Sequence, residues 1–90
     1  MIDGKTAVKI ATEYLYKMYG KGKLLNPMLE EIELSDDDKY WIVTLGFDRP
    51  KYAPGDYRDI LVGPSYQRVY KVVKVDAEKG RPKSMKMREL

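Results

Sequence analysis

The chain has 90 residues, 43% of them hydrophobic and 34% charged, so length and composition predict one globular domain rather than a disordered segment. Its net charge of +3 is too small to indicate nucleic-acid binding by itself. The sequence has no Cys and no His, which excludes disulfides, thiolate chemistry and every site that needs an imidazole, such as a serine–histidine triad.

The spacing of apolar residues predicts an amphipathic helix over residues 4–19. Asp3 is a suitable N-cap, and Gly20 can adopt the left-handed conformation that often follows a helix. The apolar face of this helix consists of Ala7, Val8, Ala11, Tyr14, Leu15 and Met18. We expect Leu15 and Met18 to lie in the core.

A β-hairpin is predicted next. Residues 20–28 contain two glycines and Asn26-Pro27, which indicate a connection. Alternation of polar and apolar residues predicts strands over residues 29–35 and 40–47, with a polar turn between them. In the second strand the apolar side chains Trp41, Val43, Leu45 and Phe47 share one face. We expect that face to meet the helix.

Two more strands complete the predicted fold. Residues 48–66 are rich in Pro and Gly and read as a long irregular connection. Residues 67–76 form a strand of imperfect alternation, so either both its faces are partly covered or a bulge near Val72 changes the register. Residues 82–89 form the last strand, with Met85 and Met87 inward. The prediction is one α+β domain over residues 1–90, a helix on a four-stranded antiparallel meander.

Charged residues are segregated along the chain. Residues 30–38 hold six carboxylates, and residues 79–88 are mainly basic, so we expect pairing within the fold. Asp36, Asp37 and Asp38 are consecutive and lack the spacing of a calcium loop, so we expect a solvated turn rather than a metal site. Glu31 and Glu33 lie on an exposed strand face, where cross-strand pairing is a better expectation than acid–base catalysis.

Two surfaces are candidates for binding. The connection interleaves Tyr with Arg, residue types that are enriched where proteins contact one another. The sheet face turned away from the helix carries Tyr40, Ile42 and Thr44, and we expect Lys71, Lys86 and Arg88 to flank them. The candidate contact residues are Arg49, Tyr52, Tyr57, Arg58 and Tyr66 in the connection and Tyr40, Lys86 and Arg88 on the sheet.

Residues 70–80, which read Tyr-Lys-Val-Val-Lys-Val-Asp-Ala-Glu-Lys-Gly, resemble the end of a PepSY-type domain, as does Met85 after them. Ala11 and Tyr14 in the helix and Trp41-Ile42-Val43 in a strand sit where that family places them. The resemblance implies a cystatin-like arrangement of one helix on a curved antiparallel sheet. It also implies binding or restraint of other proteins, as proposed for such domains in protease propeptides and at the bacterial surface. The proline-rich stretch at 48–66 departs from the family pattern.

The sequence thus predicts a non-enzymatic binding or regulatory domain that contacts another protein, without cofactor or metal. Two alternatives remain: nucleic-acid binding through Lys83, Lys86, Arg88 and the connection, and a small-ligand pocket between helix and sheet. Because the sequence shows no signal peptide and no long apolar stretch, we expect a cytoplasmic protein that does not enter membranes. It is expected to be a monomer or a homodimer.

Overall fold

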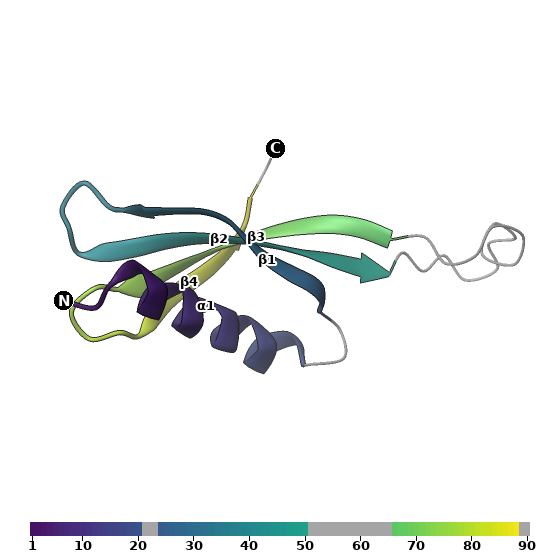
Figure 1. Ribbon diagram of the computed structural model, residues 1–90, viewed down its shortest axis with the longest axis horizontal. Helices are drawn as coiled ribbons and strands as arrows, with labels where there is room; N and C mark the ends of the chain where they lie inside the picture. Colours follow the sequence, from purple (N-terminus) through teal and green to yellow (C-terminus); the bar gives the residue numbers. More distant parts are fainter. Residues whose placement is uncertain (21–23, 51–65, 89–90) are drawn as a thin grey trace, which may run out of the picture.

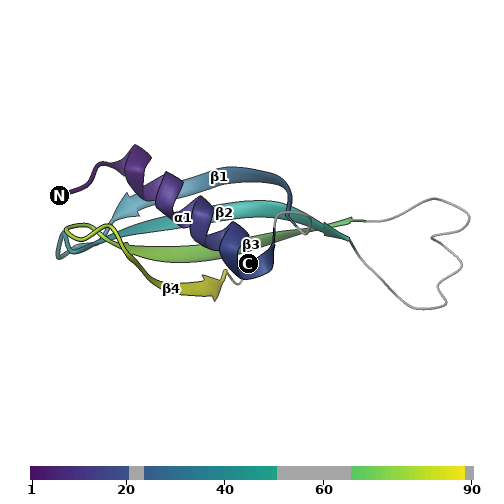
Figure 2. The same ribbon diagram turned by 90° about the horizontal axis from the view of Figure 1, so that it is seen from below.

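One helix packs on one face of a four-stranded antiparallel sheet. The computed structural model describes residues 1–20, 24–50 and 66–88. The elements are α1 (Gly4–Tyr19), β1 (Leu25–Leu34), β2 (Tyr40–Pro50), β3 (Tyr66–Asp76) and β4 (Pro82–Met87). The strands pair in chain order, β1-β2-β3-β4, and α1 lies across them on a single side (Figures 1 and 2). The predicted α+β meander is confirmed.

Both ends of α1 are closed by the residues that the sequence indicated. The Asp3 carboxylate accepts a hydrogen bond from the Thr6 backbone N–H at 2.8 Å, which satisfies one of the unpaired donors of the first turn. At the other end Gly20 has a φ of 86°, and its N–H donates to the Tyr16 carbonyl at 2.7 Å. The helix therefore begins and ends where local capping predicts.

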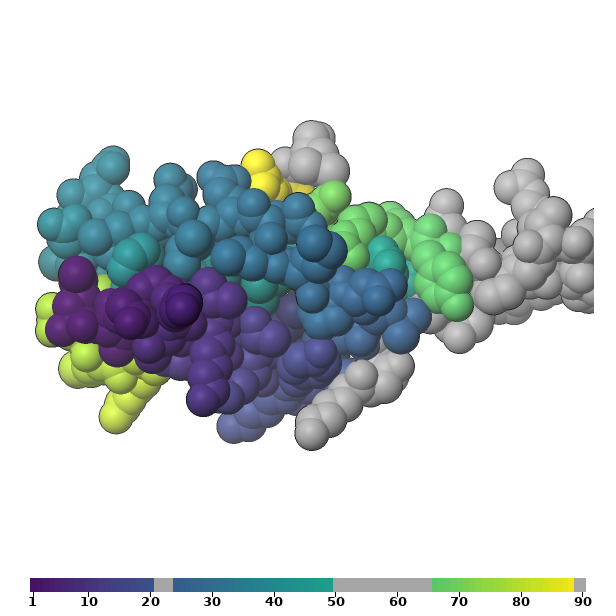
Figure 3. All heavy atoms as spheres, in the orientation of Figure 1, coloured from purple at the N-terminus to yellow at the C-terminus, as the bar shows by residue number. Residues whose placement is uncertain are grey.

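The core lies between α1 and the two central strands. Ala7, Ala11 and Leu15 of the helix are fully buried against the sheet. The sheet contributes Val43, Leu45, Phe47, Val73 and Val75, each at most 2% exposed. Alanines at two successive turns let the helix backbone approach the sheet closely, and the spheres of α1 lie against those of β1 in Figure 3. These side chains supply the main apolar burial of the described chain.

The residues before the helix are hydrogen-bonded to β2 and to the turn between β3 and β4. The Ile2 N–H donates to the Ala77 carbonyl at 2.8 Å, and the Trp41 indole Nε1 donates to the Ile2 carbonyl at 3.0 Å. Ala77 is itself fully buried in the turn between β3 and β4. We call this arrangement the Ile2 strap. It fixes the start of α1 relative to β2 and to the last hairpin.

The prediction that Met18 is a core residue is wrong, because its side chain is 57% exposed. The buried stripe advances by four residues at each turn, from Ala7 to Leu15, and the next position on it is Tyr19. The Tyr19 ring lies 5.8 Å from the Phe47 ring, centroid to centroid. Tyr19 thus takes the place that was predicted for Met18.

The strand boundaries differ from prediction mainly in β1. The stretch 20–28 was expected to be a connection, yet β1 already begins at Leu25. Asn26 has a φ of 51°, and the β1–β2 register shifts between Leu25 and Met28 and again between Leu29 and Glu31. Pro27 is tolerated because β1 is an edge strand, where a missing N–H need not cost a ladder hydrogen bond.

The central strands pair without interruption. The β2–β3 register runs from Tyr40 opposite Asp76 to Pro50 opposite Tyr66. Of the two alternatives for β3, the pairing with β2 therefore shows no bulge near Val72, and both faces of the strand are partly covered. β2 extends to Pro50 and β3 begins at Tyr66, so both ends of the predicted connection 48–66 belong to strands. Residues 51–65 lie outside the described part. The last strand ends at Met87, which lies on the helix side of the sheet as expected but is 63% exposed.

Within the described ranges, no helix combines the length and the apolar character needed to cross a membrane.

Candidate functional site

The sheet face opposite α1 is the candidate functional site, and we call it the outer face. No described element packs over it (Figure 1). Side-chain alternation and strand register assign to it Glu31 and Glu33 of β1, Tyr40, Ile42, Thr44, Gly46 and Asp48 of β2, Arg68, Tyr70, Val72 and Lys74 of β3, and Ser84 and Lys86 of β4. The rows of paired residues through its centre therefore cross four strands.

The centre of the outer face is apolar. Ile42, Tyr70 and Val72 are half-buried, and Thr44 between them is 4% exposed. The Lys74 ammonium lies 4.7 Å from the centre of the Tyr40 ring, a cation–π distance. The solvent-facing side of a sheet in a two-layer fold is usually polar. Apolar side chains at its centre therefore mark a surface for interaction.

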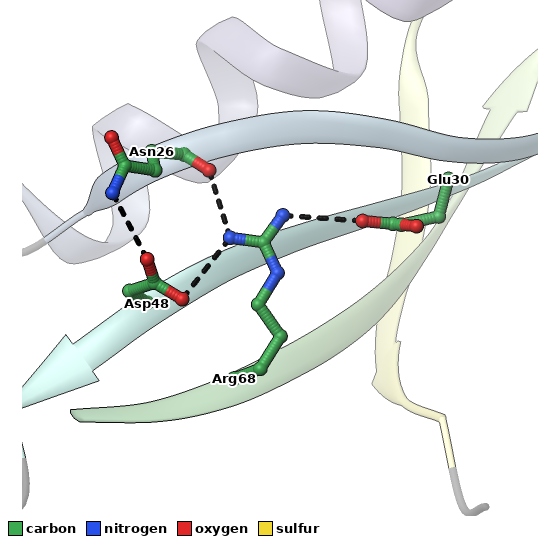
Figure 4. Close-up of polar contacts among 4 residues, drawn as sticks. All are labelled: Asn26, Glu30, Asp48 and Arg68. Atoms are coloured by element: carbon green, nitrogen blue, oxygen red, sulfur yellow. Dashed lines mark hydrogen bonds and ion pairs between the residues drawn. The ribbon is translucent and has the colours of Figure 1, made fainter.

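A polar cluster around Arg68 lies beside the apolar centre (Figure 4). The guanidinium donates from Nη1 to the Asn26 carbonyl at 2.9 Å and to Asp48 Oδ1 at 3.2 Å, and from Nη2 to Glu30 Oε1 at 3.1 Å. The Asn26 amide Nδ2 in turn donates to Asp48 Oδ2 at 3.0 Å. The left-handed backbone of Asn26 and the nearby β1 register shifts accompany this geometry.

The cluster changes the acidity of its members. Burial lowers the pKa of the Arg68 guanidinium, but hydrogen bonds to Glu30 and Asp48 outweigh burial and raise that pKa above its usual value. Hydrogen bonds from Asn26 and Arg68 lower the pKa of the Asp48 carboxyl. A Cβ placed on Gly46 would lie 2.8 Å from Glu30 Oε1 and 3.1 Å from Arg68 Nε. Glycine thus leaves room for the ion pair to lie flat on the sheet.

A further ion pair links β1 to the residue that follows β4. Arg88 follows β4, and its guanidinium Nη1 lies 3.2 Å from Glu31 Oε2 of β1, while its backbone N–H donates to the Tyr70 carbonyl. The expected pairing of the acidic residues 30–38 with the basic C-terminal stretch is confirmed for this pair. Both side chains are substantially exposed, so the pair contributes little to stability.

The outer face brings together some of the predicted contact residues. Tyr40, Lys86 and Arg88 lie on or beside its centre, and the exposed Tyr66 belongs to its far end. Arg49, opposite Gln67, lies on the helix side of the sheet and is exposed there. The remaining three predicted contact residues lie outside the described part: Tyr52, Tyr57 and Arg58.

One expected member belongs to the other face. Lys71 was predicted to flank the outer face, but it pairs with Leu45 on the helix side, and its ammonium lies 5.8 Å from the Tyr19 ring centre. The prediction was wrong because a strand with apolar residues on both sides does not reveal which side faces the helix. Tyr70 occupies the outward position instead.

The turns that follow β1 and β3 are held by internal hydrogen bonds. Asp37 Oδ1 accepts from the Ser35 hydroxyl at 2.6 Å and from the Lys39 N–H, and Asp76 Oδ1 accepts from the N–H groups of Glu78 and Lys79. These hydrogen bonds lower the pKa of both carboxyls. Across residues 1–20, 24–50 and 66–88, no group of His, Cys, Asp or Glu has the arrangement of a metal site.

Acid is expected to destabilise the fold. The pKa values of Asp3, Asp37, Asp48 and Asp76 are all lowered from 3.8 in the folded chain. Each carboxyl then binds fewer protons folded than unfolded, so its stabilisation is complete above the unfolded pKa and is lost as the pH falls through the lowered value. Urea midpoints should stay level from about pH 8 to about pH 5 and fall below about pH 4.

The matched variant for this experiment is Asp48→Asn, which should lose stability less steeply between about pH 4 and about pH 2 than the wild type does, with about one titrating group fewer. Because the chain has no His, no step is expected near pH 6.5. A midpoint that rises on acidification, or a step near about pH 6.5, would contradict this account.

No family model matches the chain, and no curated protein or solved structure matches it.

Proposed function

We propose that this chain is a non-enzymatic protein-binding domain whose contact surface is the outer face of its sheet. The observation that carries the proposal is the apolar centre of that face, formed by Ile42, Tyr70 and Val72, which no described element covers. Protein contact surfaces have this composition: an apolar and aromatic centre within a rim of charged groups.

The ionisation of the described residues supports a role other than catalysis. A general acid that works near neutral pH needs a carboxyl with a raised pKa, usually through burial. Every described carboxyl with a shifted pKa has it lowered, by hydrogen bonds at turns, at a helix cap or at Arg68. The sequence also lacks Cys and His, the most common nucleophile–base partners for covalent catalysis.

The resemblance of residues 70–80 to the end of a PepSY-type domain supports the same proposal, since such domains are proposed to bind other proteins. One helix on a four-stranded antiparallel sheet is the arrangement that this resemblance implies. Nucleic-acid binding has less support, because the carboxylates of Glu30, Glu31 and Glu33 lie on or beside the outer face and would repel phosphates.

The test compares two double variants of the tagged chain as bait in the native host's lysate. Ile42→Thr with Val72→Thr replaces two of the three side chains of the apolar centre and keeps β-branched side chains that suit a strand. Leu29→Thr with Met87→Thr is the matched control, since both side chains are exposed and lie on the helix side of the edge strands. Far-UV circular dichroism melts verify that each variant is folded.

We expect a protein that the wild type and the control retain through a high-salt wash and that the outer-face variant fails to retain. Equal retention by both variants would show that the outer face is not the contact surface. Recovery of nucleic acid that is removed by salt would instead favour the nucleic-acid alternative.

A further inference from the structure

The charges of the outer face are separated from one side to the other. In two rows of paired residues across the sheet, the residues change from acidic on β1, through uncharged on β2, to basic on β3 or β4. One row is Glu33, Ile42, Lys74 and Ser84, and the next is Glu31, Thr44, Val72 and Lys86. In these two rows the β1 side is therefore acidic, although Arg88 partly neutralises Glu31, and the β3–β4 side is basic.

We propose that the protein bound by the outer face is a second copy of this chain, packed face to face about a two-fold axis parallel to the strands. This inference rests on the proposed function of the outer face and names its partner. The apolar centres of the two copies would meet at the axis, with acidic and basic sides brought into register around them.

The direction of the axis follows from charge. Rotation about an axis parallel to the strands places β1 of one copy over β4 of the other, so negative lies over positive at both sides of the interface. Rotation about an axis perpendicular to the strands, in the plane between the sheets, would place β1 over β1 and β4 over β4, and like charges would repel. One closed two-fold arrangement is thus favoured.

The pairs that would face each other can be named. Rotation about the strand direction keeps each residue at its own height, so Glu31, which Arg88 of its own chain also contacts, lies over Lys86 of the second copy. Glu33 lies two residues further along β1, which is about 7 Å along the strand from the same lysine. The long side chain of a lysine can span that distance. Within the described ranges, Glu33 and Lys86 take part in no ion pair, so their charges are free for an intermolecular contact.

The dimensions of the face suit a dimer. The four strands have 10, 11, 11 and 6 residues, with about 3.4 Å per residue along a strand and about 4.8 Å between strands. The resulting area of roughly 600 Å² approaches the ~800 Å² per partner that stable protein interfaces bury. Aligned packing of two sheets, as in β-sandwiches, provides the geometry.

The sheet edges are less suited to association. β1 has two register shifts, which interrupt the regular row of backbone groups that a further strand would need. β4 begins with Pro82 and carries Lys83 and Lys86, and proline and lysine on an edge strand oppose pairing with another chain. The face rather than an edge is therefore the surface that a second copy fits.

The experiment is sedimentation equilibrium of the untagged full chain over a range of about 1 μM to about 1 mM. Glu33→Lys and Lys86→Glu each place like charges opposite each other in a dimer of that variant. We expect either change to raise the dissociation constant at least about tenfold. Glu13→Lys and Lys9→Glu make the same changes of net charge on exposed helix positions and should leave the dissociation constant unchanged.

Mixing the two outer-face variants gives the decisive measurement. In a mixed dimer the substituted position of the Glu33→Lys copy meets the substituted position of the Lys86→Glu copy. The unchanged Lys86 and Glu33 of the same two copies meet at the other side, so both contacts are again complementary. We expect the equimolar mixture to regain the wild-type dissociation constant. A monomeric wild type across the whole range would overturn the proposal, as would a dimer that these variants do not weaken or that the mixture does not restore.

Failure of this inference is distinguishable from failure of the proposed function. A monomeric wild type whose capture of another protein is lost through Ile42→Thr with Val72→Thr would refute the dimer and leave the outer face as a contact surface. A monomer whose captured proteins are unaffected by that variant would refute both.

Discussion

Phe47→Ala is expected to lower the free energy of unfolding by about 3–5 kcal/mol. The Phe47 side chain is 1% exposed and lies between the central strands and the end of α1, against the Tyr19 ring. Its removal forfeits the transfer free energy of the ring and leaves a cavity that the surrounding strands can close only in part. Domains of this size are stable by only about 5–15 kcal/mol, so the variant should be marginally folded at about 25 °C.

Urea denaturation followed by Trp41 fluorescence measures this effect, because Trp41 lies in the same layer of the sheet and is part-buried. The matched control is Met87→Ala, whose side chain is 63% exposed, and it should change stability by less than about 0.5 kcal/mol. Equal losses for the two variants would mean that Phe47 is not at the centre of the core. Phe47→Leu keeps most of the volume and should lose less than Phe47→Ala does.

Arg68→Met is expected to lower the free energy of unfolding by about 1–3 kcal/mol. Methionine keeps much of the length of the side chain but removes the guanidinium donors, so Glu30 and Asp48 would face each other without a counter-ion. The Asn26 carbonyl would lose a donor as well. Because Arg68 is 26% exposed, water screens the pair, and the loss should fall short of that from breaking a fully buried ion pair.

The pH dependence tests the cause of this loss. If it arises from uncompensated carboxylates, the difference between Arg68→Met and the wild type should shrink as the pH falls from about 7 to about 3 and Asp48 gains a proton. Arg68→Lys keeps the charge without the two-pronged donor geometry and should recover part of the stability. A loss that is the same at both pH values would mean that packing of the arginine stem, rather than its charge, is what matters.

The bounds of the helix could be predicted because its signals are local. Asp3 and Gly20 lie next to its ends, and the buried residues Ala7, Ala11 and Leu15 repeat at the helical period. The inward face of β2 was predicted for the same reason, since alternation from Trp41 to Phe47 is regular. Local propensity and the pattern of burial indicate the same structure in both elements, and elements of this kind can be predicted from sequence.

The Arg68 cluster was missed because it depends on register. Asp48 and Arg68 are opposite each other in the β2–β3 pairing, but the long connection between those strands leaves the register undetermined by any short turn. Glu30 joins the cluster through a register shift in β1, which Asn26-Pro27 concealed by suggesting a loop. One signal could have found the cluster. Asp48 directly follows the apolar run of β2 and Arg68 directly precedes that of β3, so two opposite charges stand at corresponding ends of two adjacent strands.

The Ile2 strap has a consequence for folding during synthesis. Ile2 is hydrogen-bonded to Ala77, about 75 residues later in the chain, and a ribosome that adds about 5–20 residues per second needs about 4–15 s to span that interval. During this time α1 lacks the last hairpin, and contacts of such long sequence separation form late. We therefore expect the helix to dock last, after the β2–β3 pairing, with its apolar stripe uncovered in the nascent chain until then.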